Sequence, residues 1–132
     1  MKTKILLSIF FSIATLLAGC KKDDLNIEDG TYKGTFSVTY SSGIKTGQTT
    51  LVLTNGKFSC SGNSNRIPAG GSGTFSSDNN KITFNDENFW TAEFDPNLIL
   101  KGTYTYTFDG KKLKIYAERN GIGNFNYYLE KQ

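Results

Sequence analysis

The 132-residue chain contains no histidine, only two cysteines and a single tryptophan. Without histidine it lacks the side chain that proteins use most often as a general base near neutral pH and as a metal ligand. Two thiols with no imidazole also fall short of the four Cys or His ligands of a typical structural zinc site. We therefore expect a protein with no catalytic residue, no metal and no cofactor, and not an enzyme.

The chain also lacks a large excess of charge of either sign. The chain has 15 basic and 12 acidic residues, and two of the basic ones, Lys2 and Lys4, lie in the first 19 positions. The remainder is close to neutral, which gives no electrostatic basis for binding nucleic acid.

The longest apolar run, ILLSIFFSIATLL at residues 5–17, follows Lys2 and Lys4. Thirteen residues at about 1.5 Å each are too short to cross a hydrocarbon layer of about 30 Å. A charged start, a short apolar run and small residues at its end are typical of a secretory signal peptide. A single transmembrane anchor is the alternative interpretation.

The apolar run ends in LAGC, residues 17–20, which resembles the lipobox of bacterial lipoproteins. In that family the cysteine thiol receives a diacylglycerol and becomes the new N-terminus, so the resemblance implies lipidation of Cys20. Two or more acyl chains, palmitate among them, hold a protein stably at a bilayer that it does not span. The predicted partner is thus a membrane, contacted through the N-terminal lipid.

Lys22-Asp23-Asp24 follows the cysteine directly. A lysine with paired acids at this place resembles the export signal of surface lipoproteins of the Bacteroidota, although a charged triplet is also typical of a solvated tether. The resemblance implies an outer-membrane lipoprotein that faces the cell exterior. We divide the chain into a signal peptide (1–19), a lipidated cysteine with a polar tether (20–29) and one domain (30–132).

Strict alternation of apolar and polar residues dominates the domain, and it predicts strands with one wetted face. Asn55-Gly56 and Asp109-Gly110 are hairpin turn signals, and Asn79-Asn80 and Asn120-Gly121 separate further strands. The strands are expected near residues 31–40, 47–54, 57–62, 73–77, 81–86, 98–108, 111–119 and 123–130.

Eight short antiparallel strands joined by hairpins predict an all-β, up-and-down barrel, because closure removes exposed edges. A two-sheet β-sandwich is the alternative fold. Gly30-Thr31-Tyr32 resembles the Gly-x-Trp that opens the first strand of lipocalin-like, calycin-type domains, with tyrosine in place of tryptophan. The resemblance implies that Arg119 covers the ring of Tyr32.

An eight-stranded barrel is just wide enough to be filled by side chains or to hold one small ligand. The side chains expected to point inward include many tyrosines, whose hydroxyls need partners when buried. Two interpretations stay open: a packed core with tyrosine hydroxyls at the rims, or a pocket for a small apolar or aromatic ligand. The candidate ligand-binding residues are Tyr32, Trp90, Tyr104, Tyr106 and Tyr127.

Two long connections interrupt the pattern. Residues 61–73 are rich in glycine and serine. Residues 86–97 hold Trp90 and several acids, and this segment forms either a short extra strand or a strap across one end of the barrel. An acid pair there would suit a glycosidase, and several carboxylates would suit calcium, but we interpret the acids as solvated. We interpret Cys60 as a buried structural thiol.

The preferred function is a non-enzymatic, lipid-anchored module that binds a small ligand. The alternative is an interaction lipoprotein with a solid core, whose loops contact an envelope protein or glycan. Its exposed candidate residues are Phe89, Ile99 and Tyr128.

Replacing Cys20 by serine removes the thiol on which lipidation depends. We expect Cys20→Ser to lose incorporation of labelled palmitate in cells and to leave the envelope fraction, whereas Cys60→Ala keeps both. A Cys20→Ser protein that still carries label and pellets with envelopes would show that this prediction is wrong.

Overall fold

A computed structural model describes residues 25–91 and 93–132. The predicted signal peptide, Cys20 and Lys22-Asp23-Asp24 lie outside the described residues. The strands are β1 (Gly30–Tyr40), β2 (Gly43–Thr54), β3 (Lys57–Cys60), β4 (Gly71–Asp78), β5 (Lys81–Asp86), β6 (Gly102–Phe108), β7 (Lys112–Arg119) and β8 (Gly123–Lys131).

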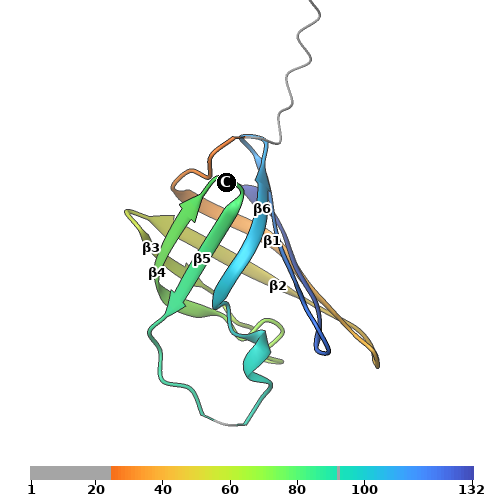
Figure 1. Cartoon of the computed structure of the whole chain (residues 1–132). Helices are drawn as coiled ribbons and strands as arrows, with labels where there is room; N and C mark the ends of the chain where they lie inside the picture. The colour runs from red at the N-terminus through yellow and green to blue at the C-terminus, as the bar shows by residue number, and fades with distance from the viewer. Residues whose placement is uncertain (1–24, 92) are drawn as a thin grey trace, which may run out of the picture.

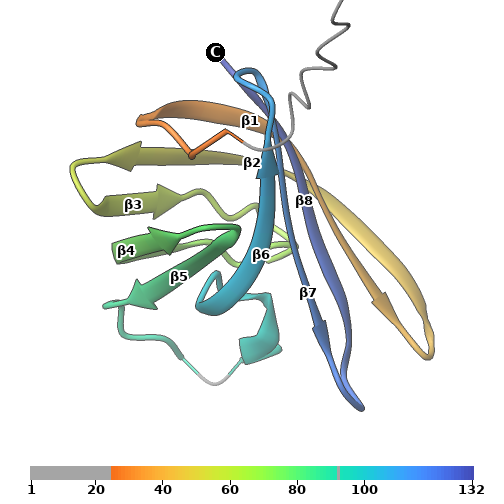
Figure 2. The same cartoon turned by 45° about the horizontal axis from the view of Figure 1, so that its top comes forward.

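Each strand pairs antiparallel with the next, and β1 also pairs with β8 from Tyr32↔Lys131 to Thr39↔Asn124. The sheet therefore closes into a barrel, as Figures 1 and 2 show. The prediction of an all-β, eight-stranded up-and-down barrel is confirmed, and the β-sandwich alternative is wrong.

The predicted hairpin turns form where the sequence signals them. At the β2–β3 turn Asn55 and Gly56 have φ of 50° and 74°, the left-handed pair that a type I′ hairpin requires. Asn79 at the β4–β5 turn has φ of 52°. These turns fix the register, so alternate residues of each strand reach the interior.

Two strands begin four residues away from the predicted position, and the other boundaries agree within two residues. β2 begins at Gly43 instead of residue 47, because β1 and β2 continue as a paired arm to Tyr40↔Gly43 beyond the barrel wall. Residues 43–46 of β2 are exposed on both faces, so this part of the sequence carries no clear alternation. β6 begins at Gly102 instead of residue 98, because Pro96–Leu98 forms a short 3-10 helix, η1.

The interior is filled mostly by aromatic and branched side chains from all the strands. Ring contacts run from Phe58 to Phe84 (4.9 Å between centroids) and on to Tyr104 (5.9 Å). They continue from Tyr104 to Tyr127 (6.1 Å) and from Tyr127 to Phe36 (4.7 Å). Rings from five strands thus form a continuous chain of contacts inside the barrel, in which aromatic pairs add about 0.5–1.5 kcal/mol each beyond their buried area.

One end of the barrel, here called the N-terminal end, is closed by residues 25–29. The Leu25 amide donates to the Phe108 carbonyl (3.2 Å), and the Tyr32 hydroxyl donates to the Glu28 carbonyl (2.5 Å). Ile27 packs against the core. This part of the expected tether lies along the barrel.

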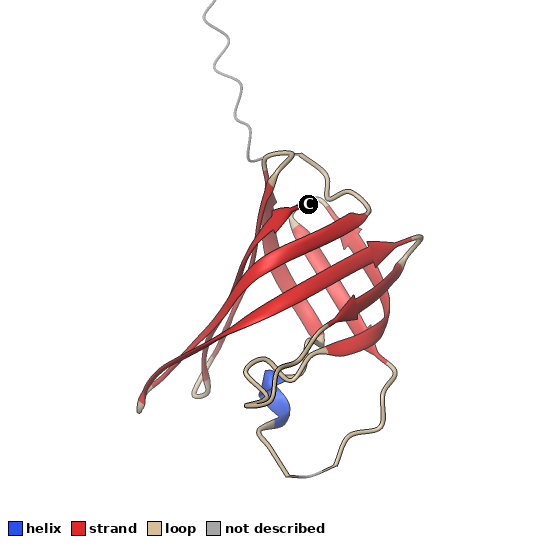
Figure 3. Cartoon of the chain, turned by 180° about the vertical axis from the view of Figure 1, so that it is seen from behind, coloured by secondary structure: helices blue, strands red, loops and turns tan. Residues whose placement is uncertain are grey.

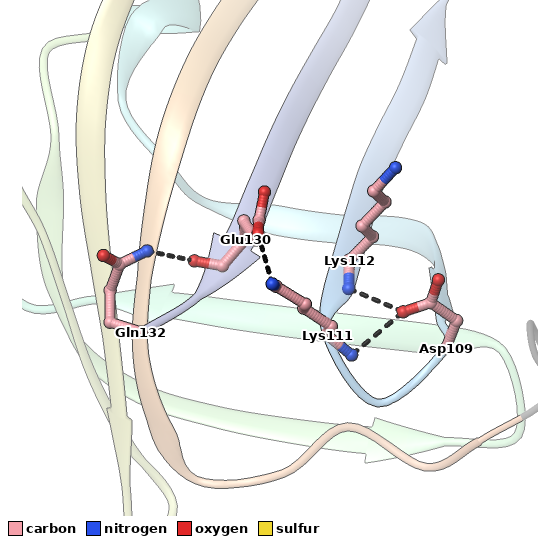
Figure 4. A network of polar contacts seen from close by, with 5 residues as sticks. All are labelled: Asp109, Lys111, Lys112, Glu130 and Gln132. Carbon is pink, nitrogen blue, oxygen red and sulfur yellow. Dashed lines mark hydrogen bonds and ion pairs between the residues drawn. The ribbon is translucent and has the colours of Figure 1, made fainter.

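The C-terminus lies at the same end, beside the β6–β7 turn. Asp109 accepts hydrogen bonds from the backbone amides of Lys111 and Lys112, which lower the pKa of its carboxyl group. Lys111 in turn forms an ion pair with Glu130 (3.0 Å), whose carbonyl accepts from the Gln132 side chain. Figure 4 shows this network, which ties the turn to the last strand.

The opposite end, here called the capped end, carries the β1–β2 and β7–β8 hairpin tips and two long connections (Figure 3). Residues 61–70 and 87–101 meet there through Ala69 N to Leu98 O and Leu100 N to Gly70 O, both 2.9 Å. Leu98, Ile99 and Leu100 are buried and form a lid on the core. The strap interpretation of residues 86–97 therefore holds in preference to an extra strand.

Ile99 corrects one prediction. The sequence places it among the exposed candidates, but it is only 3% exposed, because the connection between η1 and β6 turns it inward onto the core.

Within the described residues, no helix is both long and apolar enough to cross a bilayer.

The closest backbone approach in β1 is at Gly34. A Cβ atom there would collide with the Tyr128 carbonyl and lie 2.9 Å from Leu129 Cα, which are backbone atoms that cannot turn aside. We expect Gly34→Ala to lower the free energy of unfolding by about 1–3 kcal/mol, as overpacking does. Urea unfolding followed by circular dichroism measures this loss.

The matched control is Lys33→Ala, which changes an exposed neighbour in the same strand. Its effect should stay within about 0.5 kcal/mol. Equal stability of the Gly34→Ala variant and the unchanged protein would contradict this packing.

Candidate functional site

The five predicted ligand-binding residues do not gather in one place. The hydroxyl groups of Tyr32 and Tyr106 lie at the N-terminal end, where the Tyr106 hydroxyl accepts a hydrogen bond from the Ile27 backbone N–H (3.4 Å). Tyr104 and Trp90 lie toward the capped end, and Tyr127 packs between Phe36 and Tyr104 in the middle. The structure thus divides the five residues among the two ends and the middle of the barrel, with a ring contact between Tyr104 and Tyr127.

Burial governs the tyrosines of the interior. It raises the pKa of Tyr32 to about 12, although the hydrogen bond to Glu28 works in the opposite direction. It also raises the pKa of Tyr104 and of Tyr127. The interior therefore holds these side chains as neutral phenols.

A hollow of about 530 Å³ lies beside the lid at the capped end. Its volume is within the range of about 300–1,000 Å³ that small-molecule sites occupy, as are those of three other surface hollows of about 350, 380 and 420 Å³, so the case for it depends on its lining. We call it the Trp90 hollow. It is lined by Phe84, Asn85, Asp86, Asn88, Trp90, Ile99, Lys101, Gly102 and Arg119.

The sole tryptophan is held in place by an acid of β5. The Asp86 Oδ2 atom accepts from Trp90 Nε1 (2.5 Å), while Oδ1 accepts from the Ser72 amide (3.0 Å) and from Asn88 Nδ2 (2.8 Å). Phe94 packs edge-on to the indole, with 5.5 Å between ring centroids. The half-buried indole is therefore a fixed aromatic wall of the hollow.

The opposite wall forms where the sheet separates. β6 pairs with β7 only from Thr105↔Tyr116 to Phe108↔Leu113, so the start of β6 and the end of β7 diverge. Arg119 reaches across this gap: its Nη2 atom donates to the Lys101 carbonyl (2.9 Å) and to the Tyr104 hydroxyl (3.1 Å). The guanidinium thereby joins the end of β7 to the end of the connection 87–101.

Arg119 does not cover Tyr32, as the lipocalin resemblance implied. Its Cζ atom lies 5.2 Å from the ring centroid of Phe125 and 5.5 Å from that of Tyr104. Tyr32 contacts Phe108 instead, near the N-terminal end. The difference follows from the strand direction, because the end of β7 lies at the capped end and the start of β1 at the other.

The acids of the strap have structural partners. Asp95 caps η1, accepting from the Asn97 amide (2.9 Å), and it accepts from the Tyr40 hydroxyl (2.6 Å). Burial opposes ionisation of Asp95, but these bonds and the nearby Lys45 lower its pKa overall. Across residues 25–91 and 93–132, no group of three or more Cys, Asp or Glu side chains converges as metal ligands would.

Cys60 is buried, as expected, beside the Thr49 hydroxyl at 3.2 Å. Burial raises the pKa of its thiol to about 11, although the hydrogen bond to Thr49 opposes this shift. The thiolate is therefore scarce near neutral pH, which fits a structural role.

Sequence reasoning missed Lys101 and assigned other roles to Asp86 and Arg119. A signal for Asp86 exists in retrospect, since an acid four residues before the only tryptophan can reach the indole N–H. Arg119 required knowledge of where β6 and β7 separate, and the alternation pattern carries no trace of that point.

Comparison of the chain with protein-family models, with curated protein sequences and with solved structures gave no match. A functional assignment therefore depends on the geometry of the hollow.

Removing the Asp86 carboxylate frees the indole N–H and the Ser72 amide together. We expect Asp86→Ala to shift the fluorescence maximum of Trp90 to longer wavelength and to increase its quenching by acrylamide, because the ring becomes more solvated. Glu87→Ala, at the exposed neighbouring acid, is the control and should leave both unchanged. Identical spectra for Asp86→Ala and the unchanged protein would contradict the anchoring of Trp90.

Proposed function

We propose that this chain is a lipid-anchored cell-envelope lipoprotein, held in the outer membrane through Cys20 and facing the cell exterior. We further propose that it binds a small apolar or aromatic ligand without chemical conversion. The observation that carries the binding role is the Trp90 hollow, where a fixed indole and a half-buried arginine line a space of about 530 Å³.

The hollow suits a bound molecule better than the barrel axis does. The axis is occupied by rings in mutual contact, whereas the hollow is open and its lining is mostly polar, with the Trp90 indole as its half-buried aromatic surface. Small-molecule sites combine apolar contact with a few placed polar groups, and here Trp90 offers the first and Arg119 and Lys101 offer the second. The ligand we propose therefore lies at the rim, against Trp90 and next to Tyr104.

The position of the chain's start supports an outward-facing site. Leu25 is bonded to Phe108 at the N-terminal end, and only four residues separate it from Cys20. Such a link spans at most about 18 Å, from about 3.6 Å per residue. An anchor at Cys20 would keep the N-terminal end near the bilayer and the hollow away from it.

A second function has its own support. Ile44, Phe89 and Ile122 are 67%, 105% and 42% exposed, and all three lie at the capped end, with Ile44 and Ile122 near the two hairpin tips and Phe89 in the connection after β5. Tyr128 is also exposed, on the outer face of β8. Exposed apolar side chains of this kind suit the contact of an interaction lipoprotein with an envelope protein or glycan.

Native mass spectrometry of protein purified from its own host tests the binding role. We expect a retained small molecule in the unchanged protein and its loss from Trp90→Leu, since an aromatic contact of about 1.4 kcal/mol corresponds to tenfold in affinity. Tyr106→Phe, which alters only the N-terminal end, is the matched control and should retain the molecule. Absence of any retained molecule, or equal retention by Trp90→Leu, would contradict the binding role and favour the interaction function.

A further inference from the structure

Arg119 is a half-buried cation without an acidic partner. The ion pairs among the described residues join Lys111 to Glu130 and Lys131 to Glu28, and neither involves this arginine. Buried charges in proteins are normally paired, because removal from water disfavours a lone charge. The half-exposed guanidinium is therefore open to an anionic ligand.

The hydrogen bonds of Arg119 leave part of its guanidinium free. Both of its bonds, to Lys101 O and to Tyr104 Oη, come from the Nη2 atom. A guanidinium carries five N–H donors in a planar fork that matches the two oxygens of a carboxylate. Within the part of the chain that the structure describes, no side-chain or backbone acceptor is bonded to Nη1 or Nε.

The charges that line the Trp90 hollow favour the same kind of ligand. Lys101 and Arg119 bring two positive charges, and Asp86 brings one negative charge. The Asp86 carboxylate already accepts from Trp90, Ser72 and Asn88, so its oxygens face donors of the protein itself. The lining therefore presents a net positive charge and unused donors to the space within it.

We infer that the ligand of the Trp90 hollow is an aromatic or other planar apolar molecule bearing an oxyanion, such as a carboxylate, which Arg119 and Lys101 hold while Trp90 contacts the apolar body. This inference rests on the proposed binding function and adds the ligand's charge to it. It assigns to Arg119 a binding role beyond its contacts with Tyr104 and Lys101. Lys101 is exposed and contributes as a mobile second cation.

Two dyes that differ by one group test this charge preference. The first probe is 8-anilinonaphthalene-1-sulfonate, and the second is N-phenyl-1-naphthylamine, which has the same rings without the sulfonate. Because Trp90 is the only tryptophan, energy transfer from it to the dye detects binding to the protein, and the variants below locate the site. We expect the sulfonate dye to bind at least about tenfold more tightly than the neutral dye, and its affinity to fall with added salt.

Variants assign that difference to residues. Arg119→Gln should weaken the sulfonate dye about tenfold and leave the neutral dye unchanged, and Arg119→Lys should recover part of the loss. Lys101→Gln is the second variant, because the Lys101 side chain makes no hydrogen bond within the described residues. This variant should lower the affinity for the sulfonate dye severalfold. Lys112→Gln, on the outer wall of β7, should change neither dye. Thermal melts confirm that each variant is folded.

The outcomes separate the two proposals. Equal affinity for both dyes, or the same sulfonate affinity in Lys101→Gln, Arg119→Gln and the unchanged protein, would overturn the anion preference. A neutral molecule retained in native mass spectrometry and lost in Trp90→Leu would also overturn it while leaving the binding function intact. An anionic molecule that is retained by the unchanged protein and lost from Arg119→Gln would support both.

Discussion

Closure of the sheet between β1 and β8 is the constraint on which the rest of this structure depends. Eight strands closed on themselves enclose a narrow interior, and that space must be filled if the barrel is to be stable. In this chain the filling comes from aromatic rings that contact one another inside the barrel, such as Tyr104 with Tyr127 and Tyr32 of β1 with Phe108 of β6. A ligand along the axis would have to displace these rings, so the ligand site that we propose lies at the rim.

The proposed site at the rim depends on a point where strand pairing in the same sheet stops. The β6–β7 ladder stops at Thr105↔Tyr116, and the strands beyond it separate. Arg119 spans the opening, and the strap supplies Trp90 on the other side, fixed through Asp86. Backbone groups that leave a ladder need other partners, and here a side chain provides one while creating a concave, charged space.

The alternation of residues was sufficient to predict the fold. Sets such as Tyr104, Tyr106 and Phe108 are buried as the period of two requires, and the glycine and asparagine turns mark the hairpins. The site was much less accessible to the same reasoning. Tyr32 and Tyr106 share the inward face with Tyr104, but a period of two does not tell at which height along the barrel a residue lies.

The strap illustrates the other limit. The sequence predicts that the acids in residues 86–97 are solvated, yet Asp86 accepts a hydrogen bond from Trp90 and Asp95 accepts one from Tyr40 at the capped end of the barrel. Ile99 looked exposed and is buried, because the lid brings together two connections that are distant in sequence. Such pairings depend on tertiary contacts, which local composition does not encode.

Because the number of strands is even, β1 begins and β8 ends at the same end of the barrel, where the Gln132 backbone N–H donates to the Thr31 carbonyl. An epitope or fluorescent protein fused after Gln132 would therefore emerge beside residues 25–29, and the anchor that we propose at Cys20 would crowd it against the bilayer. The β7–β8 tip is the better position for a reporter, since a Cβ atom at Gly121 would meet nothing within 4 Å.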